Sequence, residues 1–264
     1  MTSLHGGFIN GAIDLTNIYG VDASNIWAVG ELLFNNPDPN GPFLDSSLIV
    51  KYNGFQWVQE KVNGGRELRA VWGSSPQDIW ACGVNTVLHY DGVAWIKDSI
   101  GNQTPSIQFL SVWGSSYAAV LMIGGKTDIV NGTAIDTYYL YQFNGRAWIV
   151  ADSSKSGNEK FGVLLGSVND NIYSLGYGVW RWTGLSWQMM QSSIWALGGI
   201  GGRATNDLLV CGVRDQILHY NGTDWYQFPG FTNPSIDFAQ LWSDGSSAFV
   251  VGNDGYKTYV ARGK

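Results

Sequence analysis

The residues of this chain best suited to chemistry recur at one position, six residues ahead of a glycine or its serine counterpart. Carboxylates gathered at one place can hold a cation or a polar ligand, and a pair of them can carry out acid/base chemistry on a glycosidic bond. A solvated rim is the simplest interpretation of the same residues. We name this set the collar; it comprises Asp14, Glu67, Gln108, Lys160, Ala196 and Asp237.

Other catalytic arrangements are missing from the sequence. It has no G-x-S-x-G elbow, no phosphate-binding glycine loop, no H-E-x-x-H and no EF-hand loop. Cys82 and Cys211 share one repeat position and are expected to be buried free thiols, and His89 and His219 share another that is expected to be half-exposed. We therefore predict no catalytic residue, no dedicated metal site and no cofactor, with Ca²⁺ at the collar left open.

The spacing of the collar follows from an internal repeat. The first glycine mark falls at Gly20, Gly73, Gly114, Gly166 and Gly202, with Ser243 in the sixth copy, and a second glycine follows nine or ten residues later. Five copies then carry an aromatic residue, a polar residue, a glycine and, three residues on, a tryptophan, as in Tyr90-Asp91-Gly92 and Trp95. A period of roughly 45 residues with such marks is typical of propeller blades.

Each copy is interpreted as four antiparallel strands. The first strand is the apolar run before the first glycine, and the second precedes the second glycine, as in Ile79 to Cys82. The third strand ends at the aromatic residue, and the fourth begins at the tryptophan. Asn-Gly and Asp-Gly pairs between them suit tight hairpins. The sequence predicts an all-β, six-bladed β-propeller with four-stranded blades.

One domain covering 1–264 is predicted, since 264 residues of which 45% are hydrophobic can bury a large core. The sixth copy lacks a fourth strand, and a surplus segment precedes the first copy. We expect residues near Phe8 to pair with residues near Tyr259 and so close the ring. The expected blades are 12–60, 65–100, 106–152, 158–190, 194–228 and 235–264 plus 1–11.

The connections between strands two and three, and between one copy and the next, vary most in length. In an up-and-down blade both emerge on one face, and insertions confined to one face usually mark a binding surface. The long insertions are Glu31 to Ser47 and Gly125 to Thr137. Exposed contact candidates on this loop face are Phe34, Asp38, Asp45, Asp128, Asp136, Asn158 and Phe231.

The net charge and the hydropathy of the sequence limit the classes of partner that the protein is expected to bind. A formal net charge of −6 argues against nucleic acid, and no segment is long enough for membrane insertion. Protein or glycan is the expected partner. The location is left open: extracellular or cell envelope if a signal peptide has been removed, otherwise cytoplasmic.

The phrase from Val71 to Gly83, followed by Leu88 to Trp95, resembles the tryptophan-rich blades of bacterial propeller-repeat proteins. The chain is also loosely similar to tectonin-type repeats, for example at Trp225 to Gly230. The first resemblance implies a propeller fold. The second implies a lectin that binds sugars in clefts between blades, although the loops here vary strongly from copy to copy.

Three functions are compatible with these observations. We favour a non-catalytic interaction module that uses the variable-loop face, and a protein that is not an enzyme. The first alternative is a carbohydrate-binding lectin with sites between blades. The second is a carbohydrate-active enzyme that uses the acidic collar residues at the channel mouth.

Overall fold

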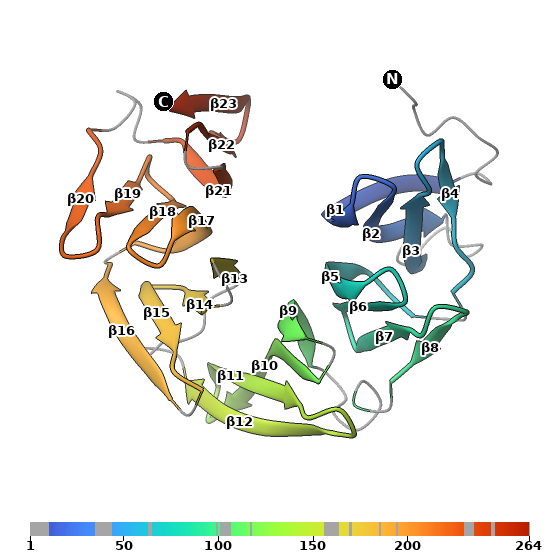
Figure 1. Cartoon of the computed structure of the whole chain (residues 1–264). Coiled ribbons are helices and arrows are strands. Elements are labelled where there is room, and N and C mark those ends of the chain that lie inside the picture. The colour runs from blue at the N-terminus through green and yellow to red at the C-terminus, as the bar shows by residue number, and fades with distance from the viewer. Residues whose placement is uncertain are drawn as a thin grey trace. The chain divides into compact units, whose positions relative to one another are not determined.

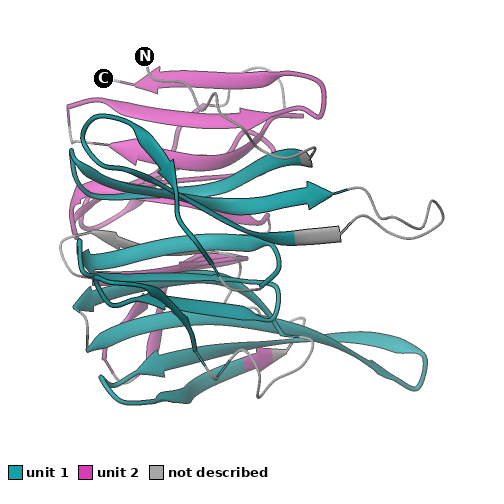
Figure 2. Cartoon of the chain, turned by 90° about the vertical axis from the view of Figure 1, so that its right-hand side faces the viewer, with its two compact units in different colours: residues 1–153 teal, residues 154–264 magenta. Residues whose placement is uncertain are grey.

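The computed structural model describes residues 11–34, 44–62, 65–98, 100, 107–116, 118–155, 164–168, 171–184, 186–193, 195–229, 235–243 and 246–263. All the secondary-structure elements that these residues form, β1 to β23, are β-strands (Figure 1). The chain divides into two compact units, residues 1–153 and 154–264 (Figure 2). No helix among the described residues is long and apolar enough to span a membrane.

The first unit is built from three antiparallel sheets of four strands. In each sheet the strands follow one another in chain order, so each strand pairs with the next along the sequence. The strands are β1 (Gly11–Asp22), β2 (Asn25–Phe34), β3 (Leu44–Tyr52) and β4 (Trp57–Gln59); β5 (Leu68–Ser75), β6 (Asp78–Gly83), β7 (Thr86–Tyr90) and β8 (Trp95–Lys97); and β9 (Gln108–Ser116), β10 (Ala119–Val130), β11 (Thr133–Phe143) and β12 (Trp148–Lys155).

The second unit continues the same pattern with two sheets of four strands and one that has three strands among the described residues. Its strands are β13 (Leu164–Val168), β14 (Asn171–Leu175), β15 (Gly178–Trp182) and β16 (Trp187–Ser192); β17 (Leu197–Ala204), β18 (Asp207–Gly212), β19 (Ile217–Tyr220) and β20 (Trp225–Gln227); and β21 (Asp237–Ser243), β22 (Ala248–Asn253) and β23 (Thr258–Gly263).

The predicted fold class, an all-β six-bladed propeller, is confirmed. In five blades the third strand ends at the aromatic residue of the repeat and the fourth begins at its tryptophan, as at Tyr90 and Trp95. The core lies between neighbouring sheets and not inside any one of them. One cluster, for example, joins Trp72 and Trp80 of the second blade to Phe109 and Met122 of the third.

The turn between the third and fourth strands shows why its residues recur. The Asp91 carboxylate oxygen Oδ1 accepts hydrogen bonds from the backbone N–H groups of Val93 and Ala94, each at 2.9 Å. Gly92 has φ of 92°, a left-handed conformation that favours glycine. The Tyr90 hydroxyl donates a hydrogen bond to the carbonyl oxygen of Gly92 at 3.1 Å. Thus three residues of the motif fix one hairpin.

The second glycine of the repeat is required by a close approach between strands. Gly83 pairs with Leu68, and the register of the first strand shifts directly after this pair. A Cβ atom on Gly83 would overlap the backbone carbonyl oxygen of Glu67, the collar residue. Gly30 stands in the same relation to Asp14, and Gly252 to Asp237. Asp14, Glu67 and Asp237 therefore sit on a backbone irregularity that only glycine accommodates.

The predicted single domain and the predicted ring closure stay predictions. Residues 1–10, which include Phe8, lie outside the described residues.

Both cysteines are free and buried, as expected. Burial raises the pKa of the Cys211 thiol to about 12 and that of Cys82 further still, which makes both thiols unreactive at neutral pH.

Substitution Gly83→Ala is expected to lower the free energy of unfolding by more than about 3 kcal/mol, because the new methyl group must displace the backbone at Glu67. Chemical denaturation followed by tryptophan fluorescence measures this loss. Gly263→Ala is the matched control, since a Cβ there meets no atom within 4 Å. Equal stability of the two variants would contradict the close-approach explanation.

Candidate interaction surface

The collar residues lie at or next to the starts of the innermost strands. Asp14 is within β1, Glu67 directly precedes β5, and Gln108 and Asp237 are the first residues of β9 and β21. Ala196 directly precedes β17, and Lys160 lies outside the described residues. Asp14, Gln108 and Asp237 are exposed, and Glu67 is half-buried. The described collar residues thus occupy the same position in the blades of each unit.

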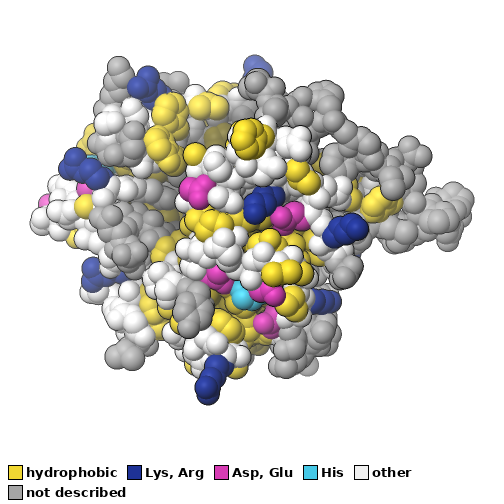
Figure 3. All heavy atoms as spheres, turned by 45° about the vertical axis from the view of Figure 1, so that its right-hand side comes forward, with side chains coloured by type: hydrophobic (Ala, Val, Ile, Leu, Met, Phe, Trp, Pro, Cys, Tyr) yellow, Lys and Arg dark blue, Asp and Glu magenta, His cyan; other side chains and the backbone are white. Residues whose placement is uncertain are grey.

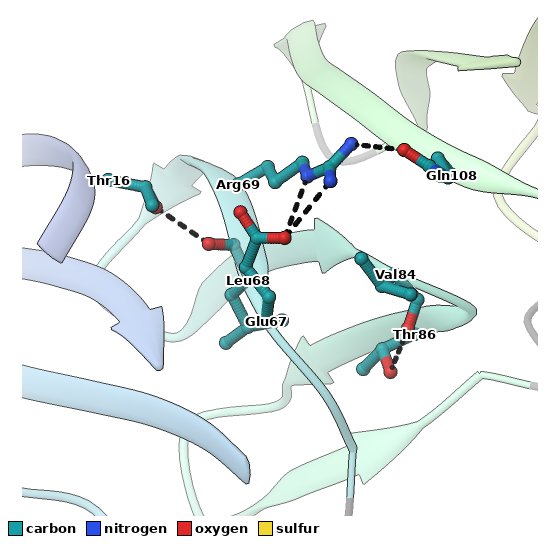
Figure 4. A network of polar contacts seen from close by, with 7 residues as sticks. All are labelled: Thr16, Glu67, Leu68, Arg69, Val84, Thr86 and Gln108. Carbon is teal, nitrogen blue, oxygen red and sulfur yellow. Dashed lines mark hydrogen bonds and ion pairs between the residues drawn. The ribbon is translucent and has the colours of Figure 1, made fainter. Parts of the chain in front are cut away.

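An arginine that the sequence analysis did not select organises the collar in the first unit. Arg69 donates hydrogen bonds from Nε and Nη2 to Glu67 Oε2, at 3.1 and 3.0 Å, and from Nη1 to Gln108 Oε1 at 2.7 Å (Figure 4). It thus links the second blade to the third. The sequence gives little signal for this contact, since Arg69 lies in the irregularity between Leu68 and Ala70, where the alternation of strand faces is interrupted.

A second hydrogen bond ties the first blade to the second close by. The Thr16 hydroxyl on β1 donates to the backbone carbonyl oxygen of Leu68 at 2.6 Å (Figure 4). In the second unit, Asp237 Oδ1 accepts a hydrogen bond from the backbone N–H of Arg214 at 3.0 Å. Two collar carboxylates are therefore engaged by neighbouring protein groups. Among the described residues, no group of three or more His, Cys, Asp or Glu side chains could hold a metal ion.

The repeated histidines pack over the cores of their own blades. The His89 ring stacks on Trp80, with ring centroids 4.0 Å apart and planes 13° from parallel, and its Nε2 lies 2.7 Å from Asp78 Oδ1. His219 repeats the contact with Asp207 at 2.9 Å. Lys51 occupies the equivalent position in the first blade and lies 4.5 Å from the Trp27 ring centroid. In the first and second blades the polar side chain at this position therefore covers a core tryptophan.

The insertion between Gly125 and Thr137, predicted from the sequence as a long loop insertion, is a paired hairpin. Pairing of β10 with β11 continues without a break from Val120 with Phe143 to Val130 with Thr133. Asn131 and Gly132 form the turn with positive φ angles of 51° and 80°. Figure 2 shows this hairpin reaching past the other strands of its unit. We call residues 125–137 the arm.

The arm combines internal polar contacts with an apolar tip. Lys126 Nζ lies 2.8 Å from Asp128 Oδ2, and this hydrogen bond raises the pKa of Lys126. The Thr127 hydroxyl donates to Asp136 Oδ1 at 2.6 Å. Beyond these contacts, Ile129 is 70% exposed and Val130 is 47% exposed. Two β-branched apolar side chains are thus presented to solvent on an ordered hairpin.

The structure describes only some of the remaining loop-face candidates. Phe34 ends β2 and is half-buried, and Asp45 lies within β3. Asp38, Asn158 and Phe231 lie outside the described residues. Asp128 and Asp136 belong to the arm, where both have partners. The arm therefore gathers the candidates that the structure places together.

A pocket of about 320 Å³ lies in the second unit, between the fifth and sixth blades. Its walls are mainly apolar and come from β17, β18, β19 and the residues after β20 on one side and from β21, β22 and β23 on the other. The polar groups at this site are the side chains of Arg203, Asp207 and Arg262 and a set of serines. The apolar lining includes Leu209, Ile217, Leu241, Val250 and Ala261.

No protein-family model and no curated protein sequence matches the chain. Solved structures do match it. YCF48 from Cyanidioschyzon merolae is 12% identical with a TM-score of 0.57, and the match covers 94% of each chain. The luciferin-regenerating enzyme is 11% identical with a TM-score of 0.54, over 94% of this chain and 90% of that one.

The acylaminoacyl peptidase of Pyrococcus horikoshii is also similar, at 11% identity and a TM-score of 0.60. That match covers 95% of this chain but 44% of the peptidase. These likenesses show the fold alone. Identities this low transfer no site and no activity, because one fold hosts many functions.

The carboxylate of Asp78 is expected to stabilise the fold only while it is ionised. Burial raises its pKa, but hydrogen bonds from His89 and Ser74 outweigh burial, so the pKa lies below its usual value. Its stabilising contribution is then present above about pH 4 and is lost as the pH falls through the folded-state pKa.

We therefore expect Asp78→Asn to be less stable than the unsubstituted protein at pH 5, with the difference shrinking below about pH 4. Thermal unfolding between pH 5 and pH 2 measures this difference. Ser74→Ala removes one of the two side-chain hydrogen bonds and should give an intermediate loss. A stability difference that is independent of pH would show that the ionised carboxylate is not responsible.

Proposed function

We propose that this protein is a non-catalytic interaction module that binds a protein partner through the arm. The observation that supports the proposal is the pair of exposed side chains Ile129 and Val130 at the tip of a continuous hairpin. Burying an exposed aliphatic side chain contributes about 1.5–3 kcal/mol. Because the hairpin is already paired, little conformational entropy would be lost on binding.

The pattern of the repeat supports the same proposal. The residues shared by the blades are engaged in turns and in blade packing, as Tyr90, Gly92 and Trp95 illustrate. The arm belongs to one blade only and contains no repeated residue. Features that the fold does not require are the better candidates for recognition. The basic side chains visible in Figure 3 stand singly, which suits a partner other than a polyanion.

Two other functions remain as alternatives to this proposal. A lectin, as the resemblance to tectonin-type repeats implies, would use aromatic surfaces between blades. An enzyme at the collar would need free carboxylates, but Glu67 is ion-paired with Arg69. We therefore rank the enzyme last.

A glycan array probed with the intact chain, with and without calcium, is expected to show no specific sugar binding. Specific sugar binding would replace our proposal by the lectin.

The arm is tested with the double variant Ile129→Asp, Val130→Asp. A partner isolated by affinity capture on the intact chain and then purified should bind the double variant at least 10-fold more weakly, because two charges replace the apolar contact. The melting temperature should not change, since both side chains are exposed. Calorimetric titration of the purified pair gives the affinity.

Ile149→Asp is the matched control, because Ile149 is an exposed isoleucine on β12 of the same blade, outside the arm. This variant should keep the full affinity. Equal affinity of the double variant and the intact chain would rule out the arm as the binding surface. Equal losses in all variants would indicate a non-specific effect of added negative charge.

A further inference from the structure

Three junctions between neighbouring blades are filled by the same aromatic contact. Trp80 on the second strand of its blade lies 5.0 Å from the Phe143 ring and 5.2 Å from the Trp148 ring of the next blade, measured between centroids. Trp27 of the first blade and Tyr173 of the fourth pack in the same way with the closing aromatic pair of the blade that follows. At each of these junctions, planar rings occupy the space between two sheets.

Among the described residues, the junction between the fifth and sixth blades lacks two of these rings. Leu209 occupies the position of Trp80, because it pairs with His219 as Trp80 pairs with the histidine of its own blade. Gly263 occupies the position of Phe143, because each pairs with the strand-two residue opposite the first glycine mark or its serine counterpart. A Cβ on Gly263 would meet no atom within 4 Å. Both residues line the pocket of about 320 Å³.

The pocket has the shape and the walls that a flat ring requires. Packed sheets lie about 10 Å apart, so a space between them is a slab. Leu241, Val250 and Ala261 contribute apolar walls, and Phe228 contributes an aromatic one. The Phe228 ring is held by Tyr226, with ring centroids 5.3 Å apart and planes 83° from parallel. An apolar cavity of about 150 Å³ is enough for benzene, so about 320 Å³ has room for the two fused rings of indole.

The charged side chains around the pocket already have partners in the protein. Arg203 Nε lies 3.7 Å from Asp207 Oδ2, and Asp207 Oδ1 lies 2.9 Å from His219 Nε2. Arg262 donates a hydrogen bond from Nη2 to Ser247 Oγ at 3.3 Å. A charged ligand would lose hydration on entering the apolar walls and would compete with these contacts for a partner. The pocket therefore favours an uncharged ligand.

We propose that the pocket between the fifth and sixth blades binds a small, uncharged, planar aromatic molecule of about the size of indole. Its ring lies between Leu209 and Gly263, in the space that planar side chains occupy at the three aromatic junctions. Phe228 offers it an aromatic contact of the offset or edge-to-face kind. The site belongs to the second unit and uses no residue of the arm, so it goes beyond the proposed function.

The site is tested by titrating the full-length chain with indole, followed by isothermal titration calorimetry and by saturation-transfer NMR. Indole should bind saturably. Leu209→Trp should weaken this binding at least 10-fold, because the new side chain fills the pocket as Trp80 fills its own junction. The same variant should raise the melting temperature by about 2–4 °C. No saturable binding of indole up to about 5 mM would overturn the proposal.

Gly263→Phe is a second pocket variant, included because Leu209→Trp can fail to fold. It introduces a ring from the opposite wall and should also weaken indole binding at least 10-fold. Val251→Trp is the matched control, since it adds an indole to a residue that is 39% exposed on β22 and does not line the pocket. This control should keep the full affinity. Unchanged affinity in both pocket variants would overturn the proposed site.

The class of ligand is tested with two alcohols of similar size. Benzyl alcohol carries a planar ring and cyclohexylmethanol a thicker, chair-shaped one, so benzyl alcohol should bind at least 5-fold more tightly. Equal affinities would overturn the preference for a planar aromatic ring. Tighter binding of N-acetyltryptophan amide than of indole would overturn the assignment to a free small molecule and would assign the pocket to a side chain of a protein partner.

Discussion

Three blades are held to their neighbours by one repeated contact, in which Trp27, Trp80 or Tyr173 on the second strand packs against the closing aromatic pair of the next blade. A small antiparallel sheet cannot bury both of its faces alone, so each blade is stable only against its neighbours. Fully burying a large aromatic side chain removes on the order of 150–250 Å² from water. Trp27 and Trp80 are almost completely buried in this way.

That contact also determines what the polar residues around it can do. His89 and Lys51 lie over Trp80 and Trp27, so they cover the core and are not free to act on a ligand. Asp78 in turn holds His89. The close approach at Gly83 places Glu67 at the start of its strand, where Arg69 pairs with it. Residues that look chemically capable in the sequence are thus largely engaged in contacts within a blade, as His89 and Asp78 are, or between blades, as Arg69 is.

The sequence predicted the blades well because the same residues both repeat and fold. The strand ends at Tyr90 and Trp95 follow from a turn that needs an Asx residue and a glycine, and such local requirements are visible in any one copy. It predicted the site less well. Arg69 occurs in one blade only, so comparing the copies could not reveal it. The strand pairing from Gly125 to Thr137 was indicated in the sequence only by its turn, Asn131-Gly132, since the flanking residues show no clear period.

The difference between repeated and unrepeated residues leads to the functional argument. A blade that must pack on two neighbours has few positions free for recognition, and those positions lie in its connections. The arm extends one such connection into an ordered hairpin with Ile129 and Val130 at its tip. Exposed apolar side chains are common on protein surfaces, but holding two of them on a paired hairpin away from the core contributes nothing to blade packing. The fold therefore gives no structural reason for the arm, and recognition of a partner gives one.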